Sequence, residues 1–332
     1  MNPSYRIERW TTASRISVWV FALLFLAACF LSQSGNDSLL SRGVVLFVYV
    51  LLAATWNALA GFAGLMSVGQ QAFFGLGAYF AIRLSDSGVP VFAAMGLSAI
   101  IVAALSWPMS IVMLRLKDGE FAIGMWVLAS LCHLLVNLDP LIQGETGISL
   151  IALNAYDPET RRVILFLFAL VSTTAVLGFL FFLLQSRFGT ALQAIRDNDE
   201  AAGSLGVNVL KAKRLIFVFA AFGGAIAGAL WLGANISFQP KTYFGVQWSA
   251  YMIFMVLVGG IGTFEGAILG AIVFFIIETF FAAFGVWYLI GLGTAAIVFS
   301  LVFPQGIWGT VVRKWNLHLL PIGRRLSISN EK

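Results

Sequence analysis

A few polar residues interrupt the long apolar segments of this sequence, and chemistry inside a hydrophobic environment could occur only at such positions. They are Asn57, Gln70, Gln71, His133, Asn137, Glu265 and Glu278. Glu278 stands out, because Phe-Phe-Ile-Ile precedes it and Thr-Phe-Phe follows it. An ionisable group there is costly and usually faces the interior of a helix bundle, where it lines a path or holds a helix contact. Glu265 lies near an expected helix start, where a carboxylate suits the helix dipole, so a structural role is favoured for it.

The usual catalytic arrangements are absent from the sequence. It has no G-x-x-x-x-G-K-[ST] phosphate loop, no paired catalytic carboxylates, no nucleophile motif and no metal-ligand spacing. Cys132 and His133 are adjacent, so on a helix their side chains point in different directions. We therefore expect no catalytic residues, no metal site and no cofactor bound by this chain.

The composition indicates an integral membrane protein. Of 332 residues, 60% are hydrophobic and only 11% are charged, whereas soluble domains contain about 25% charged residues. The apolar runs are continuous and longer than the alternating strands of about ten residues that build a membrane β-barrel. We expect an all-α polytopic protein with one helical domain.

Ten membrane spans are predicted, since a helix needs about twenty apolar residues to cross the hydrocarbon core. They lie near residues 16–33, 43–60, 66–84, 90–114, 121–138, 163–185, 215–235, 248–260, 265–284 and 287–303. The third span is interrupted by glycines and two glutamines, and the eighth is short.

The distribution of positive charge predicts the orientation. With both termini inside, the inner segments hold 15 of the 20 Lys and Arg residues, and 5 remain for the outer segments. This asymmetry favours a cytoplasmic N-terminus and C-terminus. The expected organisation is a cytoplasmic tail over 1–15, a membrane domain over 16–303 and a second cytoplasmic tail over 304–332.

The longest polar interruption, residues 186–214, is predicted to be a structured cytoplasmic loop. One short helix is expected over 190–198, with Leu192 and Ile195 on one face. A second helix should begin near Asp199 and end around Gly206, because glycine commonly ends helices. We interpret this loop as a docking element for a protein outside the membrane. The alternative is a solvated loop that only satisfies the orientation rule.

Glycines interrupt the sequence in two corresponding regions, one around the second and third spans and one around the eighth and ninth. Interrupted spans in both halves of a chain indicate a substrate path, although small residues also permit close helix packing. The candidates for the lining of a translocation path are Asn57, Gln70, Gln71, Gly75, Gly77, Gly259, Gly260, Gly262 and Glu278.

Four segments resemble the permease subunits of bacterial ABC importers, in particular the branched-chain amino-acid, LivM-like type. The loop contains Ala-Ile-Arg-Asp-Asn at 194–198 and Glu-Ala-Ala-x-x-x-Gly at 200–206. The other three are Asn57 to Tyr79, Arg115 to Ile123 and Val256 to Ala271. The resemblance covers roughly residues 45–305.

The resemblance implies a transport subunit of an ATP-driven importer in the bacterial inner membrane. It implies a second, related permease, with a heterodimer favoured, two cytoplasmic ABC ATPases that use ATP-Mg, and a periplasmic binding protein that delivers the substrate. Membrane lipid is a further partner, and no nucleic acid is expected. The residues implied to couple the permease to the ATPase are Arg196, Asp197, Asn198, Glu200, Ala201, Ala202 and Gly206.

Two departures from the family pattern leave the substrate open. Residues 143–148 read Gln-Gly-Glu-Thr-Gly-Ile, and residues 264–266 read Phe-Glu-Gly. Branched-chain or related small amino acids are the first expectation, urea or short amides are the alternative, and sugars come after them. A stand-alone secondary carrier would need ligands for a coupling ion, for which Glu278 is the one candidate. A membrane-embedded enzyme or scaffold would need a polar cluster at a shared depth.

Overall fold

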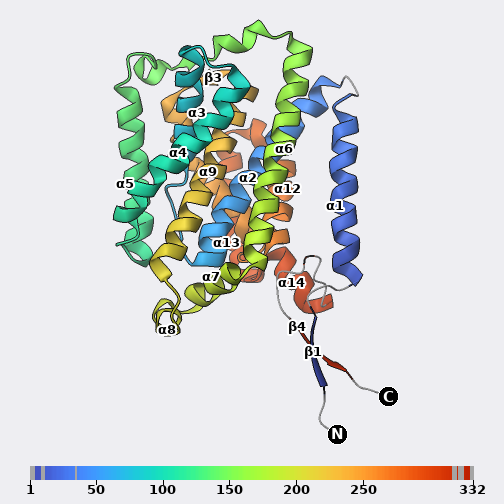
Figure 1. Cartoon of the computed structure of the whole chain (residues 1–332). Coiled ribbons are helices and arrows are strands. Elements are labelled where there is room, and N and C mark those ends of the chain that lie inside the picture. The colour runs from blue at the N-terminus through green and yellow to red at the C-terminus, as the bar shows by residue number, and fades with distance from the viewer. Residues whose placement is uncertain (1–3, 9–11, 34–35, 316–319, 321–324, 330–332) are drawn as a thin grey trace.

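The structure is a computed structural model that describes residues 4–8, 12–33, 36–315, 320 and 325–329. Long helices run side by side and form one membrane-type bundle (Figure 1). Parts of the predicted tails, 1–15 and 304–332, lie outside the described residues. The all-helical prediction is confirmed, since strands are confined to two small two-stranded sheets in the described part of the chain.

Each predicted span contains one long helix. The bounds are α1 Thr12–Leu31, α2 Asp37–Asn57, α3 Gln71–Asp86, α4 Val91–Met113, α5 Asp118–Asn137, α6 Pro158–Gln185, α9 Val209–Asn235, α11 Gln247–Gly259, α12 Phe264–Phe281 and α13 Val286–Val302. The short helices are α7 Arg187–Asp197, α8 Asp199–Ser204, α10 Pro240–Tyr243 and α14 Gly306–Trp315, with single turns η1 Ala58–Phe62, η2 Gly144–Thr146, η3 Ile151–Ala155 and η4 Ala282–Phe284.

Eight stretches of helix in the described residues are long and apolar enough to cross a membrane. The other two are α1, whose apolar part is the shorter stretch Ile16–Leu31, and α3, which has 16 residues and begins at Gln71, five residues later than predicted. The segment before it is not helical: Gly64 has a left-handed φ of 70°, and the Trp56 Nε1 atom donates a 2.8 Å hydrogen bond to the Ser67 carbonyl. The eighth span is longer than predicted, because α10 continues α11 back to Pro240.

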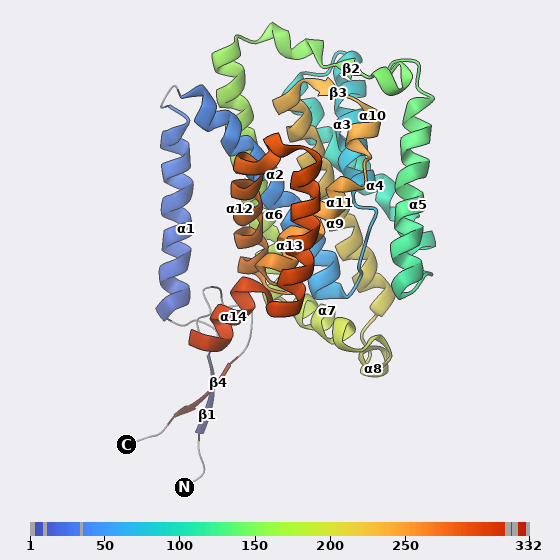
Figure 2. The same ribbon diagram turned by 180° about the vertical axis from the view of Figure 1, so that it is seen from behind.

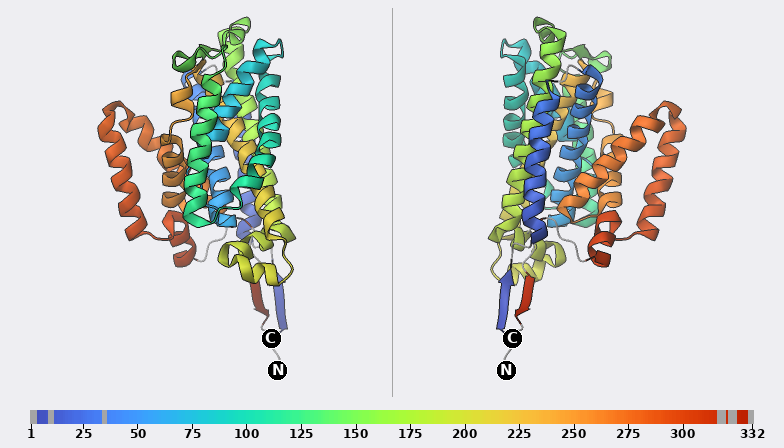
Figure 3. Two further views of the ribbon diagram at one scale, coloured as in Figure 1. Left: turned by 90° about the vertical axis from the view of Figure 1, so that its left-hand side faces the viewer. Right: turned by 90° about the vertical axis from the view of Figure 1, so that its right-hand side faces the viewer.

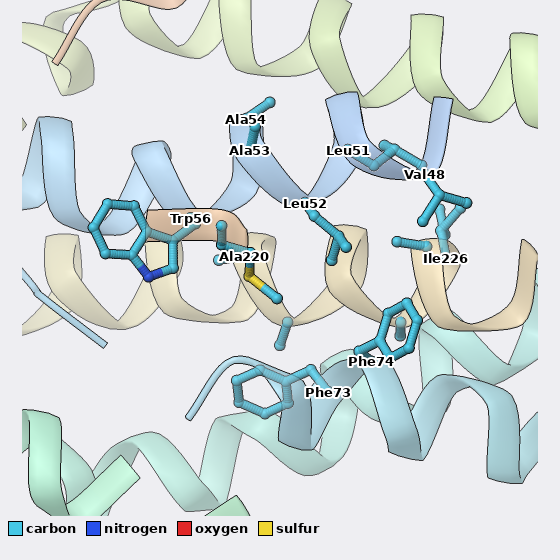
Figure 4. Packing of buried hydrophobic residues seen from close by; sticks show 14 of the residues in the cluster. Val48, Leu51, Leu52, Ala53, Ala54, Trp56, Phe73, Phe74, Ala220 and Ile226 are labelled. Carbon is cyan, nitrogen blue, oxygen red and sulfur yellow. The ribbon is translucent and has the colours of Figure 1, made fainter. Parts of the chain in front are cut away.

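Two helices, α2 and α9, form the centre of the bundle and are the most buried spans. Figure 4 shows Leu52 and Trp56 of α2 packed against Ala220 of α9, with Phe73 and Phe74 of α3 beside them. Close approach is possible because α9 carries glycines at the contacts; a Cβ atom on Gly228 would overlap the Phe74 carbonyl. Small residues thus replace large side chains where membrane helices touch.

One helix hairpin stands away from this centre. Figure 3 shows that α13, with the end of α12, leans out from the bundle. Most of α13 is exposed, and Val286, Trp287 and Leu301 are each more than 70% exposed. This face is suited to lipid or to another membrane protein.

Both chain ends lie at the end of the bundle that carries α7 and α8 (Figure 2). There β1 (Ser4–Glu8) pairs antiparallel with β4 (Arg325–Ser329). At the opposite end β2 (Ile148–Ser149) pairs antiparallel with β3 (Ser237–Phe238). The predicted placement of both termini and the charged loop on one side is confirmed, and the distribution of positive charge makes that side cytoplasmic.

Candidate functional site: the cytoplasmic loop and its junction with the bundle

The loop folds into two short helices joined at Asn198. Ser186 caps α7 by accepting a 3.1 Å hydrogen bond from the Phe188 N–H, and Asn198 caps α8 through a 2.9 Å bond from the Ala201 N–H. Gly206 follows α8 with φ of 87°, which ends the helix. The predicted helix pair is confirmed, although α7 begins at Arg187 rather than 190, because Ser186 provides the cap.

One side of the loop packs on the bundle and the other side faces the solvent. Leu192, Ile195 and Ala202 are buried. The exposed side includes six of the seven predicted coupling residues: Arg196, Asp197, Asn198, Glu200, Ala201 and Gly206. Leu205, between them in sequence, is 84% exposed. The helix pair therefore presents an exposed surface of polar and small residues with one large apolar side chain, Leu205.

Arg196 connects this surface to the interrupted end of α2. Its Nη1 atom donates a 3.0 Å hydrogen bond to the Gly61 carbonyl in η1. Its Nε and Nη2 atoms donate to Asp197 Oδ1 at 3.1 and 3.0 Å. The Arg196 backbone also lies against Gly64, since a Cβ atom there would be 3.4 Å from the Arg196 Cα. The Arg196 guanidinium is thus bound both to the bundle, at Gly61, and to its own loop, at Asp197.

Asn57 connects the same end of α2 to the turn between α11 and α12. Its Nδ2 atom donates to the Thr263 carbonyl at 2.8 Å, and its Oδ1 atom accepts from the Gly262 N–H at 2.9 Å. Asn57 is 1% exposed. Both halves of the side-chain amide are therefore satisfied by backbone groups of one turn.

The glycines at this point are needed for close approach. A Cβ atom on Gly61 would lie 2.5 Å from the Gly262 nitrogen, and one on Gly262 would lie 2.8 Å from Arg196 Nη1. Gly262 also has φ of 75°. We call the set Asn57, Gly61, Arg196, Gly262 and Thr263 the loop junction. Arg196 is a predicted coupling residue, whereas Asn57 and Gly262 are predicted path residues, and the structure brings all three together.

The other path candidates lie inside the bundle. Gln70 and Gln71 are at most 3% exposed, the Ser249 hydroxyl donates to Gln71 Oε1, and neither Nε2 atom has a hydrogen-bond partner among the described residues. Gly75 lies against the Phe244 ring, Gly77 against the Ala225 backbone and Gly259 against Gly266, while Gly260 has φ of 129°. These glycines permit close packing, and their role in a path stays a prediction.

Glu278 lies apart from the junction, toward the outer end of α12. Its Oε1 atom accepts a 2.6 Å hydrogen bond from the Tyr49 hydroxyl of α2. Tyr49 is 1% exposed, and its ring meets Phe274 edge-on with centroids 4.9 Å apart. The sequence offered no signal for Tyr49, because a tyrosine in an apolar run is common.

The outer loop is tied to the bundle by two carboxylates. Burial opposes ionisation of Asp139, but hydrogen bonds from the Tyr79 hydroxyl at 2.7 Å and the Leu141 N–H at 3.0 Å, with Arg83 nearby, lower its pKa. Asp139 thereby holds the end of α5 against α3.

Glu145, in the segment that departs from the family pattern, has a similar function. Partial burial opposes its ionisation, but its Oε1 atom accepts from Asn137 and lies 2.7 Å from His133 Nε2, and its Oε2 atom accepts from the Lys241 N–H at 3.0 Å. Together these contacts lower the pKa of Glu145. The sequence analysis treated His133 and Asn137 as isolated polar residues and did not identify this link to the outer loop.

The sequence of this chain is similar to those of known transport permeases. Residues 39–305 match a family model described as branched-chain amino acid transport system / permease component. The high-affinity branched-chain amino acid transport system permease protein LivM of Escherichia coli is 25% identical over 316 residues, which cover 86% of this chain and 74% of LivM. LivH of the same organism is 24% identical over 79% of this chain and 91% of its own length. A probable LivM of Methanocaldococcus jannaschii is 30% identical over 140 residues, 42% of this chain and 40% of that protein.

Proposed function

The chain belongs to the family of branched-chain amino acid transport system permease components, and from that premise we propose that it forms the translocation path for branched-chain amino acids in an ATP-driven importer. As an ABC importer permease it is a multi-pass protein of the bacterial inner membrane and a transport subunit. Family membership alone assigns neither the substrate nor the route by which movement of an ATPase reaches the membrane helices.

The loop junction is the observation that supports this proposal most directly. The exposed side of α7 and α8 provides a surface on which a cytoplasmic ATPase can dock. Arg196 extends from that surface to the Gly61 carbonyl, and Asn57 continues the connection to the α11–α12 turn. A displacement of the loop can therefore reach α2, α11 and α12 through two side chains, Arg196 and Asn57, that are both hydrogen-bonded to backbone groups. Such helix motions are the means by which transporters change access.

The partners follow from the same reasoning. Two ABC ATPases beneath the loop hydrolyse ATP-Mg, since this sequence has no phosphate loop. A second, related permease completes the path, and LivM and LivH are two such relatives. A periplasmic binding protein delivers the amino acid to the outer end, where small loops and the β2–β3 pair leave little surface for independent recognition.

Affinity purification of this chain from its native membrane is the first test. We expect a second permease and ABC ATPases to co-purify, and the complex in proteoliposomes should take up leucine when the binding protein and ATP are supplied. ATP-dependent uptake of urea and not of leucine would show that the proposed substrate is wrong. Uptake by this chain alone, without ATP, would mean a secondary carrier and contradict the proposal.

The role of the loop is tested by Arg196→Glu and Gly206→Pro in the same complex. Both should uncouple ATP hydrolysis from uptake while leaving membrane insertion intact. Arg313→Glu is the matched control, because Arg313 is an exposed arginine of α14, outside the loop and its junction. Normal coupling in both loop variants would refute this role.

A further inference from the structure

A cavity opens between α11, α12 and α13, away from the loop junction. Its volume is about 460 Å³, and it is lined mainly by apolar and aromatic side chains. Its lining includes Phe254 of α11, Ile277 of α12, and Tyr288 and Leu292 of α13. Pockets that hold small organic ligands have about this volume, with few polar groups at defined positions.

An ionisable cluster adjoins this cavity. Glu278 follows the lining residue Ile277 on α12 and accepts the hydrogen bond of Tyr49. The Tyr49 and Tyr251 rings both pack on Phe274, one helical turn before Glu278, and Tyr288 of α13 interacts electrostatically with Glu278. Of these four side chains Tyr288 lines the cavity, and the other three lie behind the lining residues contributed by α11 and α12.

One polar group in this cluster is left without a partner. Tyr288 is 9% exposed and its ring lines the cavity, yet its hydroxyl has no hydrogen-bond partner among the described residues. A buried hydroxyl without a partner is unfavourable, because it has lost its hydrogen bonds to water. α13 also begins beside the cavity, at Val286, and the first N–H groups of a helix have no partner within it.

We propose that this cavity is a subsite for an amino acid with an aliphatic side chain, bound during passage through the permease. The inference rests on the proposed function and deepens it. The ammonium group binds the Glu278 carboxylate beside the aromatic rings, which attract cations. The carboxylate binds the Tyr288 hydroxyl and the start of α13, where the helix dipole favours an anion. The aliphatic side chain occupies the space lined by Phe254, Ile277 and Leu292. Each of the two charges needs its own polar partner, because an isolated charge in an apolar cavity is unstable.

Two variants test the subsite in the intact complex with its ATPases. Glu278→Gln keeps an acceptor for Tyr49 but removes the charge, and Leu292→Trp fills the cavity. The matched controls are Thr279→Val, next to Glu278 but exposed, and Ile290→Trp, on α13 but outside the cavity lining. We expect both test variants to lower ATP-driven leucine uptake at least tenfold, and both controls to stay within twofold of the unmodified complex.

A binding measurement in nanodiscs without the binding protein identifies the chemical group that is recognised. Radiolabelled leucine should be displaced by isoamylamine, which has the ammonium and the side chain, and much less by 4-methylpentanoate, which lacks the ammonium. Glu278→Gln should abolish the binding of radiolabelled leucine in this assay. Gel filtration of each variant shows whether the complex assembles. If the Glu278→Gln complex does not assemble, Tyr49→Phe is the milder change to the same cluster.

The failures of the two proposals are distinguishable. If the unmodified complex imports leucine and the test variants match their controls, the subsite is wrong and the proposed function stands. If the unmodified complex imports urea and not leucine, the proposed substrate is wrong and the subsite falls with it.

Discussion

The loop junction and the Glu278 cavity share one helix and are built in opposite ways. Asn57 and Tyr49 are both on α2, eight residues and about 12 Å apart along its axis. At the junction both halves of the Asn57 amide are paired and glycines remove any space between the segments. At the cavity a hydroxyl is unpartnered and about 460 Å³ is open.

This difference separates two physical tasks. A contact that transmits displacement must be rigid, so the junction uses hydrogen bonds from side chains to backbone groups and direct packing of backbone on backbone. A site that binds and releases a ligand must keep free volume and unsatisfied polar groups until the ligand arrives. We therefore expect changes at the junction to alter stability and coupling, and changes at the cavity to alter substrate handling.

The largest effect is expected from Gly262→Ala. The new Cβ atom would lie 2.8 Å from Arg196 Nη1 and 3.0 Å from the Gly61 carbonyl oxygen, at φ of 75°. The left-handed backbone contributes roughly 1–2 kcal/mol and overpacking roughly 1–3 kcal/mol, so a loss of about 3 kcal/mol should appear as a lower Tm. Gly88→Ala is the control, because Gly88 has φ of 92° with nothing within 4 Å. Equal Tm shifts in the two variants would show that the junction is not tightly packed.

Asn57→Ala should have the next largest effect. It leaves the Gly262 N–H and the Thr263 carbonyl without their partner, which destabilises by about 1–3 kcal/mol for a buried group. We expect a lower Tm and more ATP hydrolysed per leucine imported. Asn208→Ala removes only an exposed helix cap to the Lys211 N–H and should leave that ratio unchanged. If Asn57→Ala leaves the ATP hydrolysed per leucine unchanged, Asn57 does not take part in coupling.

Tyr49→Phe should have a smaller effect of a different kind. It removes the 2.6 Å hydrogen bond to Glu278 and keeps the ring contact with Phe274, so the loss of stability should be about 1 kcal/mol. The rate of leucine uptake should fall while the ATP hydrolysed per leucine stays the same. A changed ratio here would mean that the two regions of α2 are not separate in function.

The smallest effect concerns pH at the outer loop. The pKa values of Asp139 and Glu145 are lowered, so their stabilising contribution is present above the pKa of the unfolded chain, about 3.9 for Asp and 4.3 for Glu. It is lost as pH falls through the lower pKa of the folded state. The Tm should therefore be constant from pH 7 to about pH 5 and fall slightly below pH 4. The decrease in Tm should be smaller in Asp139→Asn and in Glu145→Gln, because the replaced side chain can no longer ionise. If the variants show the same decrease in Tm as the unmodified protein, other groups cause it.

Local sequence patterns were sufficient for the elements of the fold. Apolar length predicted the spans, the Lys and Arg distribution predicted the shared side of the termini and loop, and Gly206 marked the end of α8. These properties depend on interactions within a few residues or with the membrane. The start of α3 was predicted too early, because the break at residues 64–70 depends on contacts such as that between Trp56 and Ser67.

The order of the helices and the structured loop between α6 and α9 follow from the sequence alone, whereas the pairs of residues that meet depend on the folded bundle. Arg196 bonds a carbonyl 135 residues away, Asn57 bonds a turn more than 200 residues away, and Tyr49 reaches Glu278 across 229 residues. No periodicity encodes such pairs, because they arise from the packing of whole helices. Single polar residues in apolar runs could therefore be identified as unusual, but their partners were set by the folded bundle.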